Sequence, residues 1–513
     1  MEYIYLILGI ISLFFIGYAP VYFLLPGRGG FRAGSRSVSG GFFIFFLSFF
    51  TGALMTGWMM TVLSLFDIGF GPEIVYGISA VFFVFYIYNF LSVRFRSSER
   101  KSINRLDRDV LTAKERSREK DKKTPEKCQQ APSERRKRSA ACRQRESRAS
   151  RMLFAVLTAL IIINFGAVLF LAILFPIRFW DAVSCWSLKG KAFFLDGIIN
   201  DFFLLHDYSF SHQSYPLYLP LIQTWLFTWM REVNENLVKI IFPLFYSSLL
   251  FTLYYLFRQR LGKLVSISFV FIISFLPVIA DHGYIEYTNL LFSVIMLLAV
   301  YFLYLAIAIK GKTSYLILSA IFFAILALTR SEGIIYVMIF ILLSIFFFVR
   351  RLKGVYSLKK NLLNLLMPLA VFVIFLTPWY LLKLRLGIPA ISAEWEIFLG
   401  KGSMDFGRAA AVMGRQFLLS VYDSTRAVLG SFYGPVWVLM LIALLLRLKQ
   451  HFRDYNWIFF VFIAAGMVSI FVSLAAIPDF ANSAERYILH IFPVTYYWVI
   501  TNSAGKDWKG NTI

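Results

Sequence analysis

The run LFAVLTALIIINFGAVLFLAILFPI at residues 153–177 contains no charged side chain. A helix needs about 20 apolar residues to cross a hydrocarbon core about 30 Å thick. Similar runs recur along the chain, and 59% of its 513 residues are hydrophobic, above the roughly 45 to 50% of a soluble domain. The alternating ten-residue segments of a membrane β-barrel are absent from the sequence. We therefore expect an all-α polytopic membrane protein.

Apolar runs of this kind predict about 13 transmembrane helices. The expected spans lie near residues 2–25, 41–66, 73–93, 153–177, 236–257, 264–280, 287–309, 314–329, 333–349, 363–384, 428–446, 455–477 and 487–502.

The basic residues are concentrated in one segment. Residues 94–151 hold 21 Lys and Arg against 9 Asp and Glu, so +12 of the formal net charge of +23 lies there. The rest is scattered over short loops, so we expect no nucleic-acid partner and interpret the segment as a solvated tail attracted to anionic membrane lipid. Its composition also predicts disorder. A specific partner site on this segment is the alternative.

The orientation follows from the Lys and Arg excess that cytoplasmic loops carry. One of the two possible orientations of the chain places every basic loop in the cytoplasm. This orientation leaves two long loops, 178–235 and 385–427, on the outer side. We therefore expect a multi-pass protein, of a bacterial plasma membrane, with its active site on the external face. The predicted regions are three amino-terminal helices in 1–93, the basic cytoplasmic segment 94–151, a transmembrane core over 152–502 and a cytoplasmic tail over 503–513.

An amphipathic helix is expected in the first outer loop. Apolar residues between positions 187 and 207 recur at helical spacing and would share one face of a helix, whereas the charged residues would lie on its other faces. Such a pattern is typical of a helix that lies in the interface plane. The apolar stripe consists of Leu188, Ala192, Leu195, Ile199, Phe202 and Leu205.

Acidic residues stand at the outer ends of two spans. Asp181 follows Trp180 directly after the run that ends near Pro176, and Glu286 precedes the next long apolar run. A partly desolvated carboxylate tends to bind its proton more tightly, which suits a general base. An ordinary solvated loop aspartate is the alternative for Asp181. Acidic groups at membrane depth are functional by default.

Cations and aromatic residues accompany these acids in the outer segments. Arg330 with Glu332, and Glu485 with Arg486, stand at two further helix boundaries. Each could be a snorkelling Arg with its counter-ion. Several carboxylates and fixed cations on one side are, however, what transfer with a phosphate leaving group requires. Further candidates for substrate binding are Lys189, Lys191, His212 and Tyr215.

These residues, in this order, resemble the type-C glycosyltransferases, in particular the bacterial group similar to protein O-mannosyltransferases and the aminoarabinose transferase of lipid A. The matching elements are Trp180-Asp181-Ala182 with Lys189 and Lys191, the stretch His212 to Pro216, Gly283 to Glu286, Arg330 to Gly333, and Glu485-Arg486-Tyr487. The resemblance covers about residues 153–500. The first three spans and the basic segment look like an addition to that core.

The resemblance implies inverting transfer of a sugar from a polyprenyl-phosphate donor. Asp181 would be the general base for the acceptor, and Glu286 would orient or assist it. Lys191, Arg330 and Arg486 would hold the lipid phosphate. It implies no cofactor, and it leaves open the help of a divalent metal ion, the sugar, and whether the acceptor is a glycan, lipid or protein.

Two other functions fit a membrane protein of this composition. A transporter or flippase of a lipid-linked saccharide would be expected to show inverted repeats and midplane polar groups, and we find no repeat. A polysaccharide polymerase or ligase would share the chemistry but use a diphosphate lipid donor. Cys128, Cys142 and Cys185 form neither a metal-binding pair nor a disulfide framework.

Overall fold

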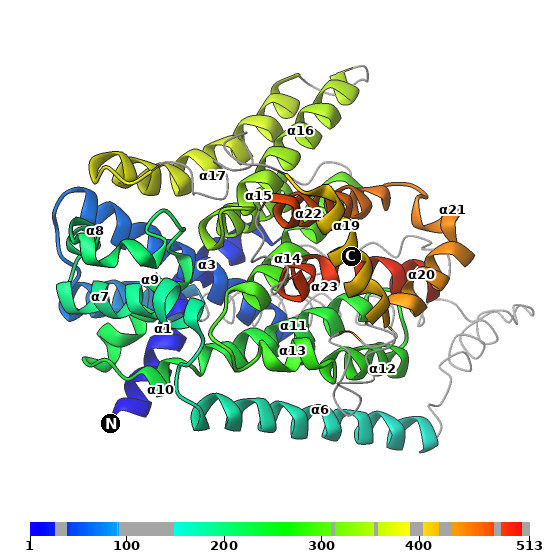
Figure 1. The fold of residues 1–513 in the computed structure, drawn as a ribbon, viewed down its shortest axis with the longest axis horizontal. Coiled ribbons are helices and arrows are strands. Elements are labelled where there is room, and N and C mark those ends of the chain that lie inside the picture. The colour runs from blue at the N-terminus through cyan, green and yellow to red at the C-terminus, as the bar shows by residue number, and fades with distance from the viewer. Residues whose placement is uncertain are drawn as a thin grey trace, which may run out of the picture.

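The computed structural model describes residues 1–25, 38–89, 91, 148–308, 313–352, 358–389, 404–419, 433, 436–476 and 484–504. Helices make up nearly all of this part of the chain (Figure 1). They are α1 (Glu2–Leu24), α3 (Val38–Leu65), Pro72–Asn89, α6 (Arg148–Leu174), the π-helix η1 (Ala182–Ser187), α7 (Leu188–Asp196), α8 (Asn200–Leu204), the 3-10 helix η2 (His206–Ser211), α9 (Tyr218–Met230), α10 (Glu235–Val238), α11 (Ile241–Arg258), α12 (Lys263–Ser274), α13 (Pro277–Asp281), α14 (Asn289–Ala308), α15 (Thr313–Thr329), α16 (Gly333–Leu352), α17 (Leu358–Arg385), α19 (Phe406–Leu419), α20 (Val436–Leu446), α21 (Leu448–His451), α22 (Trp457–Ala476) and α23 (Ala484–Ala504).

The helix lengths confirm an all-α polytopic membrane protein. Within the described residues, eight helices are long and apolar enough to cross a membrane, and four shorter apolar helices accompany them. The expected number of about 13 spans is not confirmed. The span predicted over 264–280 is divided into α12 and α13 before Pro277. The span predicted over 236–257 corresponds to the candidate membrane span Glu235–Arg258, in which a turn at Lys239 separates α10 from α11. The sequence-based topology also missed α9, a buried helix within the first outer loop.

Helix α14 forms the centre of the bundle. Its side chains from Asn289 to Ile307 are all buried, and it packs against α15, α23, α11 and α22. Figure 1 shows α14 near the middle, with α6 along one edge and α16 and α17 along the opposite edge. The core is therefore built mainly of segments carboxyl-terminal to residue 235.

The amino-terminal helices α1 and α3 are packed into this core. Their backbones touch where Gly17 faces Gly52: a Cβ on Gly17 would lie 1.8 Å from the Ser48 carbonyl oxygen, and one on Gly52 would lie 1.8 Å from that of Leu13. Small residues permit such close helix crossings in membranes. Helix α3 also packs against α9, α11 and α17, so it belongs to the same packed body as the region predicted to carry the chemistry.

The helix expected over residues 187–207 is divided. Helix α7 ends where Gly197 adopts a φ of +65°, and α8 starts at Asn200, whose side chain donates to Asp67 and to the Ser64 carbonyl of α3. Ile199 is buried, whereas Leu195 is 66% exposed. The expectation of one continuous apolar stripe is therefore wrong. The bend at Gly197 lets the apolar residues of α7 and those of α8 face different directions.

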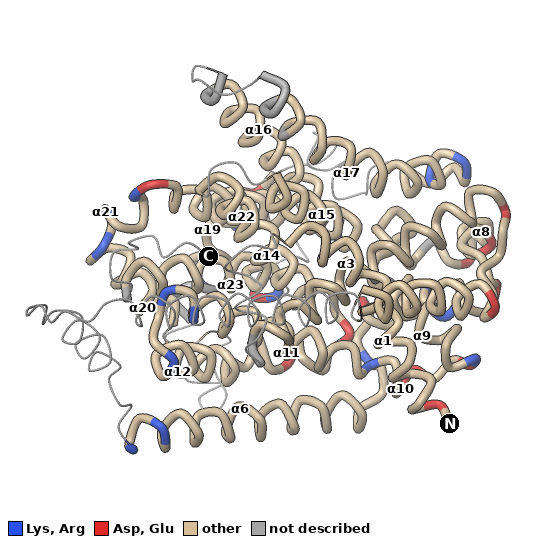
Figure 2. Tube along the Cα trace, turned by 180° about the vertical axis from the view of Figure 1, so that it is seen from behind, with Lys and Arg blue, Asp and Glu red and all other residues tan. Residues whose placement is uncertain are grey.

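Charged residues lie at both ends of the bundle. Lys and Arg at the start of α6, at the start of α12 and along α21 lie at one end, and acidic residues near α8 lie at the other end, together with the Lys and Arg of the last turn of α17 (Figure 2). Most of residues 94–151, the tail over 503–513 and much of the loop 385–427 lie outside the described residues.

Candidate active site

Asp181 stands where the chain leaves α6 and begins η1. Its Oδ2 accepts a hydrogen bond from Nη1 of Arg486 at 3.0 Å, and the two residues are 305 positions apart in the chain. The Asp181 side chain is 45% exposed and that of Arg486 is 20% exposed. The structure thus joins the predicted base to a predicted phosphate-binding cation, at a place that an incoming acceptor can reach.

Arg486 is fixed by contacts on two sides. It lies in the first turn of α23, and its backbone carbonyl accepts a hydrogen bond from Asn289 Nδ2 at 3.0 Å, which ties α23 to the start of α14. Its guanidinium carbon lies 4.6 Å from the centre of the Tyr287 ring. A cation held over an aromatic face keeps its charge while much of its water is removed. Burial raises the pKa of Tyr287 to about 12, so this hydroxyl is a neutral donor at physiological pH.

Arg330 lies in the turn between α15 and α16. Its Nη2 donates to Glu332 Oε1 at 3.0 Å and to the Tyr487 hydroxyl at 3.2 Å, and its Nη1 donates to Thr288 Oγ1 at 3.2 Å. Only 10% of the Arg330 side chain is exposed. Since Tyr487 follows Arg486 directly, both arginines border the same part of α23.

The turn that carries Arg330 requires a glycine. A Cβ at Gly333 would lie 2.2 Å from the Leu326 carbonyl oxygen, so the backbone of α16 starts in direct contact with the last turn of α15. This close approach keeps the Arg330 and Glu332 backbones at the helix ends instead of in a longer, mobile loop.

Glu286 forms a buried ion pair that the sequence analysis did not predict. Its Oε1 lies 2.5 Å from Nζ of Lys239, and the two side chains are only 2% and 1% exposed. Burial raises the pKa of Glu286, while the positive charge of Lys239 opposes this shift. Lys239 also donates to the Phe175 carbonyl at 2.5 Å, just before the segment that leads to Asp181. This pair therefore connects the Glu286 loop to the base-bearing segment.

Lys189 contacts the turn formed by residues His212 to Tyr215. Its Nζ donates to the His212 carbonyl at 2.8 Å and lies 5.8 Å from the centre of the Tyr215 ring. The His212 ring, whose residue has a φ of +50°, stacks on Tyr215 at 4.8 Å. Tyr215 also interacts electrostatically with Arg330. Burial, with a smaller effect of the Lys383 charge, lowers the pKa of Lys189 to about 7.

Lys191 has a different environment from Lys189, although both are on α7. Its Nζ lies 3.2 Å from Oε1 of Glu235, and both side chains are 43% exposed. An exposed pair of this kind contributes little to stability. Whether Lys191 binds the donor stays a prediction, and Glu235 is the partner that the donor would have to replace.

The buried Lys189 predicts a pH-dependent stability difference. Its pKa in the folded protein is below the value of about 10.4 for an unfolded lysine, so the unfolded chain binds more protons between about pH 7 and pH 10. The free energy of unfolding of the wild type should therefore rise with pH relative to Lys189→Met, by at most about 1.4 kcal/mol per pH unit. Thermal unfolding of both proteins between pH 6 and pH 9 measures this difference. Lys191→Met is the matched control and should run parallel to the wild type. Parallel curves for Lys189→Met would contradict the buried environment.

Several residues of the site were missed in the sequence. Tyr287 and Tyr487 each follow a residue that was predicted, and they contact Arg486 and Arg330. His282 and His490 are buried, and within the described part of the chain their Nε2 atoms have no hydrogen-bond partner. The spacing of Arg486, Tyr487 and His490 along one helix was an available signal. The donor set of the site is rich in cations, hydroxyls and imidazoles, which are partners for phosphate oxygens.

Cys185 is buried on η1. Burial raises the pKa of its thiol, and the charges of Lys189, Asp181 and Arg330 also act on it. Because Cys185 is only 3% exposed, it is unsuited to accessibility labelling of the first outer loop.

Comparison with known proteins identifies the central part of the chain. Residues 215–381 match the family model described as dolichyl-phosphate-mannose-protein mannosyltransferase. The match includes Tyr215, Glu286, Arg330 and Glu332 but neither Asp181 nor Arg486. No curated protein and no solved structure matches the chain. The family match confirms the resemblance to the type-C membrane glycosyltransferases and supports lipid-linked sugar transfer by a membrane glycosyltransferase.

Proposed function

We propose that this membrane glycosyltransferase transfers a sugar from a polyprenyl-phosphate donor to an acceptor on the non-cytoplasmic face, with inversion at the anomeric carbon. The observation that carries the proposal is the 3.0 Å contact between Asp181 and Arg486. It places a half-exposed carboxylate beside a fixed cation, which is the pair that base-assisted displacement of a phosphate requires.

The reaction is a single displacement. The acceptor hydroxyl gives its proton to the Asp181 carboxylate while its oxygen forms a bond to the anomeric carbon. The bond from that carbon to the phosphate oxygen breaks, and its electron pair leaves with the polyprenyl phosphate. Arg330 and Arg486 stabilise the negative charge that develops on the departing oxygen. Attack opposite the leaving group inverts the anomeric carbon.

Arg486 has two roles in this mechanism. Its guanidinium binds Asp181, and a donor phosphate placed between Arg486 and Arg330 would compete for the same guanidinium. Donor binding would then release the Asp181 oxygen that accepts from Arg486. The base would become free to accept a proton only when a donor is present, which disfavours unproductive chemistry.

Glu286 and Lys239 would act as positioning residues. Their side chains are buried, so neither is placed to meet an acceptor directly. The pair holds the loop that contains Tyr287, the ring on which Arg486 lies, and Lys239 reaches the Phe175 carbonyl next to the base-bearing segment. Breaking a buried ion pair by removing one partner is destabilising. The direct assistance to Asp181 that the resemblance implies for Glu286 stays a prediction.

Product analysis tests the proposed reaction. Purified protein in sealed proteoliposomes is supplied with a polyprenyl-phosphate donor carrying a radiolabelled sugar and with membrane extract as the source of acceptor. Release of unlabelled polyprenyl phosphate, together with a labelled acceptor, is the expected result. Donor that crosses the membrane without losing its sugar would support a transporter instead. A diphosphate lipid donor that is consumed in place of the monophosphate would support a polymerase or ligase.

The proposed sidedness predicts a labelling pattern in intact cells. Asp207 is exposed in the first outer loop, so Asp207→Cys in a cysteine-free background should react with a membrane-impermeant maleimide. Cys142, restored alone in the same background, should react only after the membrane is permeabilised, because the basic segment is expected inside. Gel-shift analysis of the two proteins measures the difference. Labelling of Cys142 from outside would invert the topology and move Asp181 to the cytoplasmic face.

A further inference from the structure

The π-helix η1 and α7 form one continuous helical segment over residues 182–196, with Asp181 at its start. The residues that join η1 to α7 keep helical backbone angles, and the segment ends only at Gly197, whose φ is +65°. Arg486 contacts Asp181 at the first end of the segment. The second end is held by a part of the chain that precedes the family resemblance.

The second end of the η1–α7 segment is bound to the carboxyl end of α3. The Gly197 carbonyl accepts a hydrogen bond from the backbone N–H of Phe70 at 2.8 Å. Asn200 is buried, and its Nδ2 donates to the Ser64 carbonyl at 3.0 Å and to Asp67 Oδ1 at 2.7 Å. The last carbonyls of a helix have no partner within that helix, so Asn200 satisfies one of those that α3 leaves free.

Asp67 also binds the last turn of α17. Arg385 donates to Asp67 Oδ2 and to the Leu65 carbonyl, and a cation beside the carboxyl end of a helix is favoured by the helix dipole. The carboxylate of Asp67 thus joins Asn200, at the start of α8, to Arg385, where α17 ends. One side chain of the amino-terminal region therefore connects two elements that lead into the two long outer loops.

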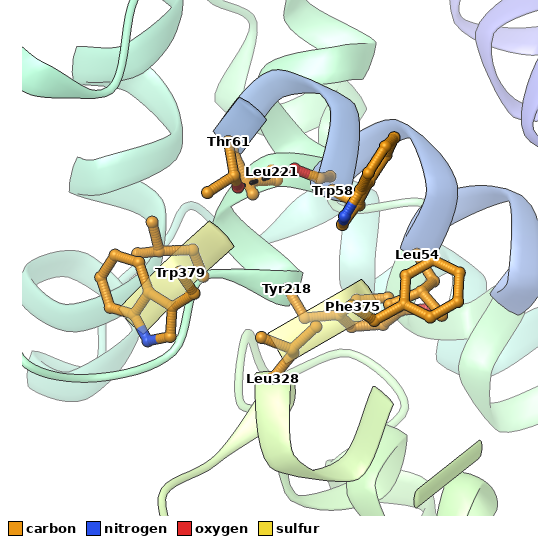
Figure 3. A pocket seen from close by; sticks show the side chains of 10 residues that line it. Leu54, Trp58, Thr61, Tyr218, Leu221, Leu328, Phe375 and Trp379 are labelled. Carbon is orange, nitrogen blue, oxygen red and sulfur yellow. Dashed lines mark hydrogen bonds between the residues drawn. The ribbon is translucent and has the colours of Figure 1, made fainter. Parts of the chain in front are cut away.

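Helix α9 makes a second connection between the η1–α7 segment and the amino-terminal helices. Thr224 of α9 donates to the Gly190 carbonyl of α7 at 3.1 Å, and the Tyr218 hydroxyl donates to the Phe50 carbonyl of α3 at 2.8 Å. Figure 3 shows Tyr218 at the junction of α3, α9, α15 and α17, where the remaining cavity has a volume of about 20 Å³. Such a cavity holds about one water molecule, so α9 is closely packed against α3.

Resting on the proposed function, we propose that the amino-terminal helices hold the η1–α7 segment in the position that transfer requires, and that Asp67 is a positioning residue for this reaction. A helical segment that is fixed at Gly197 and along α9 cannot tilt, so its first residue, Asp181, stays beside Arg486. The helices before residue 90 are then part of the catalytic apparatus, although they precede the residues 215–381 that match the family.

Asp67 can be changed without straining the backbone. Its φ is +56°, a conformation that glycine adopts at no steric cost and that asparagine tolerates. Asp67→Gly removes the acceptor for both Asn200 and Arg385, whereas Asp67→Asn keeps an oxygen for Asn200 and loses only the charge. Asp454→Gly is the matched control, because Asp454 has a φ of +54° and its carboxylate lies 3.7 Å from Arg453 between α21 and α22.

Turnover and donor binding are measured separately on the full-length proteins, by single-turnover transfer with saturating donor and by scintillation proximity with radiolabelled polyprenyl phosphate. Asp67→Gly should lower turnover about tenfold or more, since a misplacement of about 1 Å can cost about 10² fold. Its affinity for polyprenyl phosphate should stay that of the wild type, because Arg330 and Arg486 belong to other elements. Asp67→Asn should lose less, and Asp454→Gly nothing. Normal turnover of Asp67→Gly, an equal loss in Asp454→Gly, or an affinity that falls as much as turnover would overturn the proposal.

Pulsed EPR reports the position of the η1–α7 segment independently of sugar transfer. Nitroxide labels are placed on Leu195→Cys in α7 and Leu439→Cys in α20, in a cysteine-free background. Both side chains are exposed, and the two helices lie at opposite ends of the bundle in Figure 1. Asp67→Gly should shift or broaden the distance distribution, and Asp454→Gly should not.

The outcomes separate the two proposals. An unchanged distance distribution in Asp67→Gly would show that Asp67 does not hold the segment. A changed distribution with wild-type turnover would refute only the positioning role. A changed distribution in a protein whose wild type transfers no sugar would refute the proposed function and leave the attachment of the segment to α3 standing.

Discussion

Asp181→Asn is expected to lower sugar transfer by about 10² to 10⁴ fold, the usual contribution of a general base. The amide has nearly the same volume as the carboxylate, and it can still contact the surroundings of Arg486, so the protein should remain folded and inserted. It cannot accept the proton of the acceptor hydroxyl. Turnover should therefore fall, while donor affinity should stay the same or increase, because the carboxylate that competes with the donor phosphate for Arg486 has lost its charge.

The matched control for this prediction is Asp201→Asn. Asp201 is an exposed acid in the first turn of α8, in the same outer loop, and its replacement should leave turnover unchanged. Single-turnover transfer with saturating donor measures the chemical step directly. If Asp181→Asn retains near-normal turnover, Asp181 is not the base, whatever its contact with Arg486.

Removal of Arg486 is expected to have the second large effect. Loss of one preorganised donor to a developing oxyanion typically costs about 10² to 10³ fold in turnover, and Arg486→Ala should show a loss of this size. Arg330→Ala should behave similarly, since both cations border one site. Arg486→Lys should restore only part of the activity, because a lysine is a point charge and cannot grip two phosphate oxygens in the planar manner of a guanidinium.

Arg408 distinguishes a structural arginine from one that acts on the donor. Its guanidinium donates to the backbone carbonyls of Leu474 and Ala475 at the end of α22. Arg408→Ala should therefore lower the thermal stability more than the turnover of the folded protein. Arg486→Ala should show the opposite pattern. Arg330→Ala should lower both turnover and thermal stability, because it also leaves the largely buried Glu332 without its partner. Stable variants of both arginines with normal turnover and donor affinity would place the phosphate elsewhere, with Lys189 and Lys191 as the next candidates.

A double-mutant cycle adds a test of the Asp181 to Arg486 contact itself. If the two residues serve one step, the double variant Asp181→Asn with Arg486→Ala should be far less impaired than the product of the two single losses. Independent effects that multiply would show that the two residues do not act in one step.

Much of the fold could be predicted because apolar runs alone decide where helices form in lipid. The span around residues 289–308 is a single helix in the structure, as expected. The breaks were not predictable from hydropathy, because they depend on partners that are distant in sequence. Lys239 lies at the break between α10 and α11. The carboxylate that neutralises this buried lysine is that of Glu286, which belongs to another loop. A lysine in an apolar run otherwise indicates only a helix end.

The candidate site was predictable as a set of residues but not as a geometry. Topology placed Asp181, Arg330 and Arg486 on the same side, and it could not state which of them touch. Contacts such as the one between Arg330 and Tyr487 depend on how α15 and α23 are positioned relative to each other. The sequence of an apolar helix does not indicate which of its residues will face which neighbouring helix. Likewise, α9 was read as loop because it is too short to cross the bilayer, although its side chains are almost all buried.

The separation of Asp181 and Arg486 in the chain has a consequence for biosynthesis. Arg486 on α23 is 305 positions beyond Asp181, so the ion pair cannot form until the ribosome has completed that part of the chain. Until α23 has been inserted beside α14, the nascent chain carries Asp181 without its arginine. If the two residues act together as proposed, the nascent chain would transfer no sugar for most of the time that it is being made.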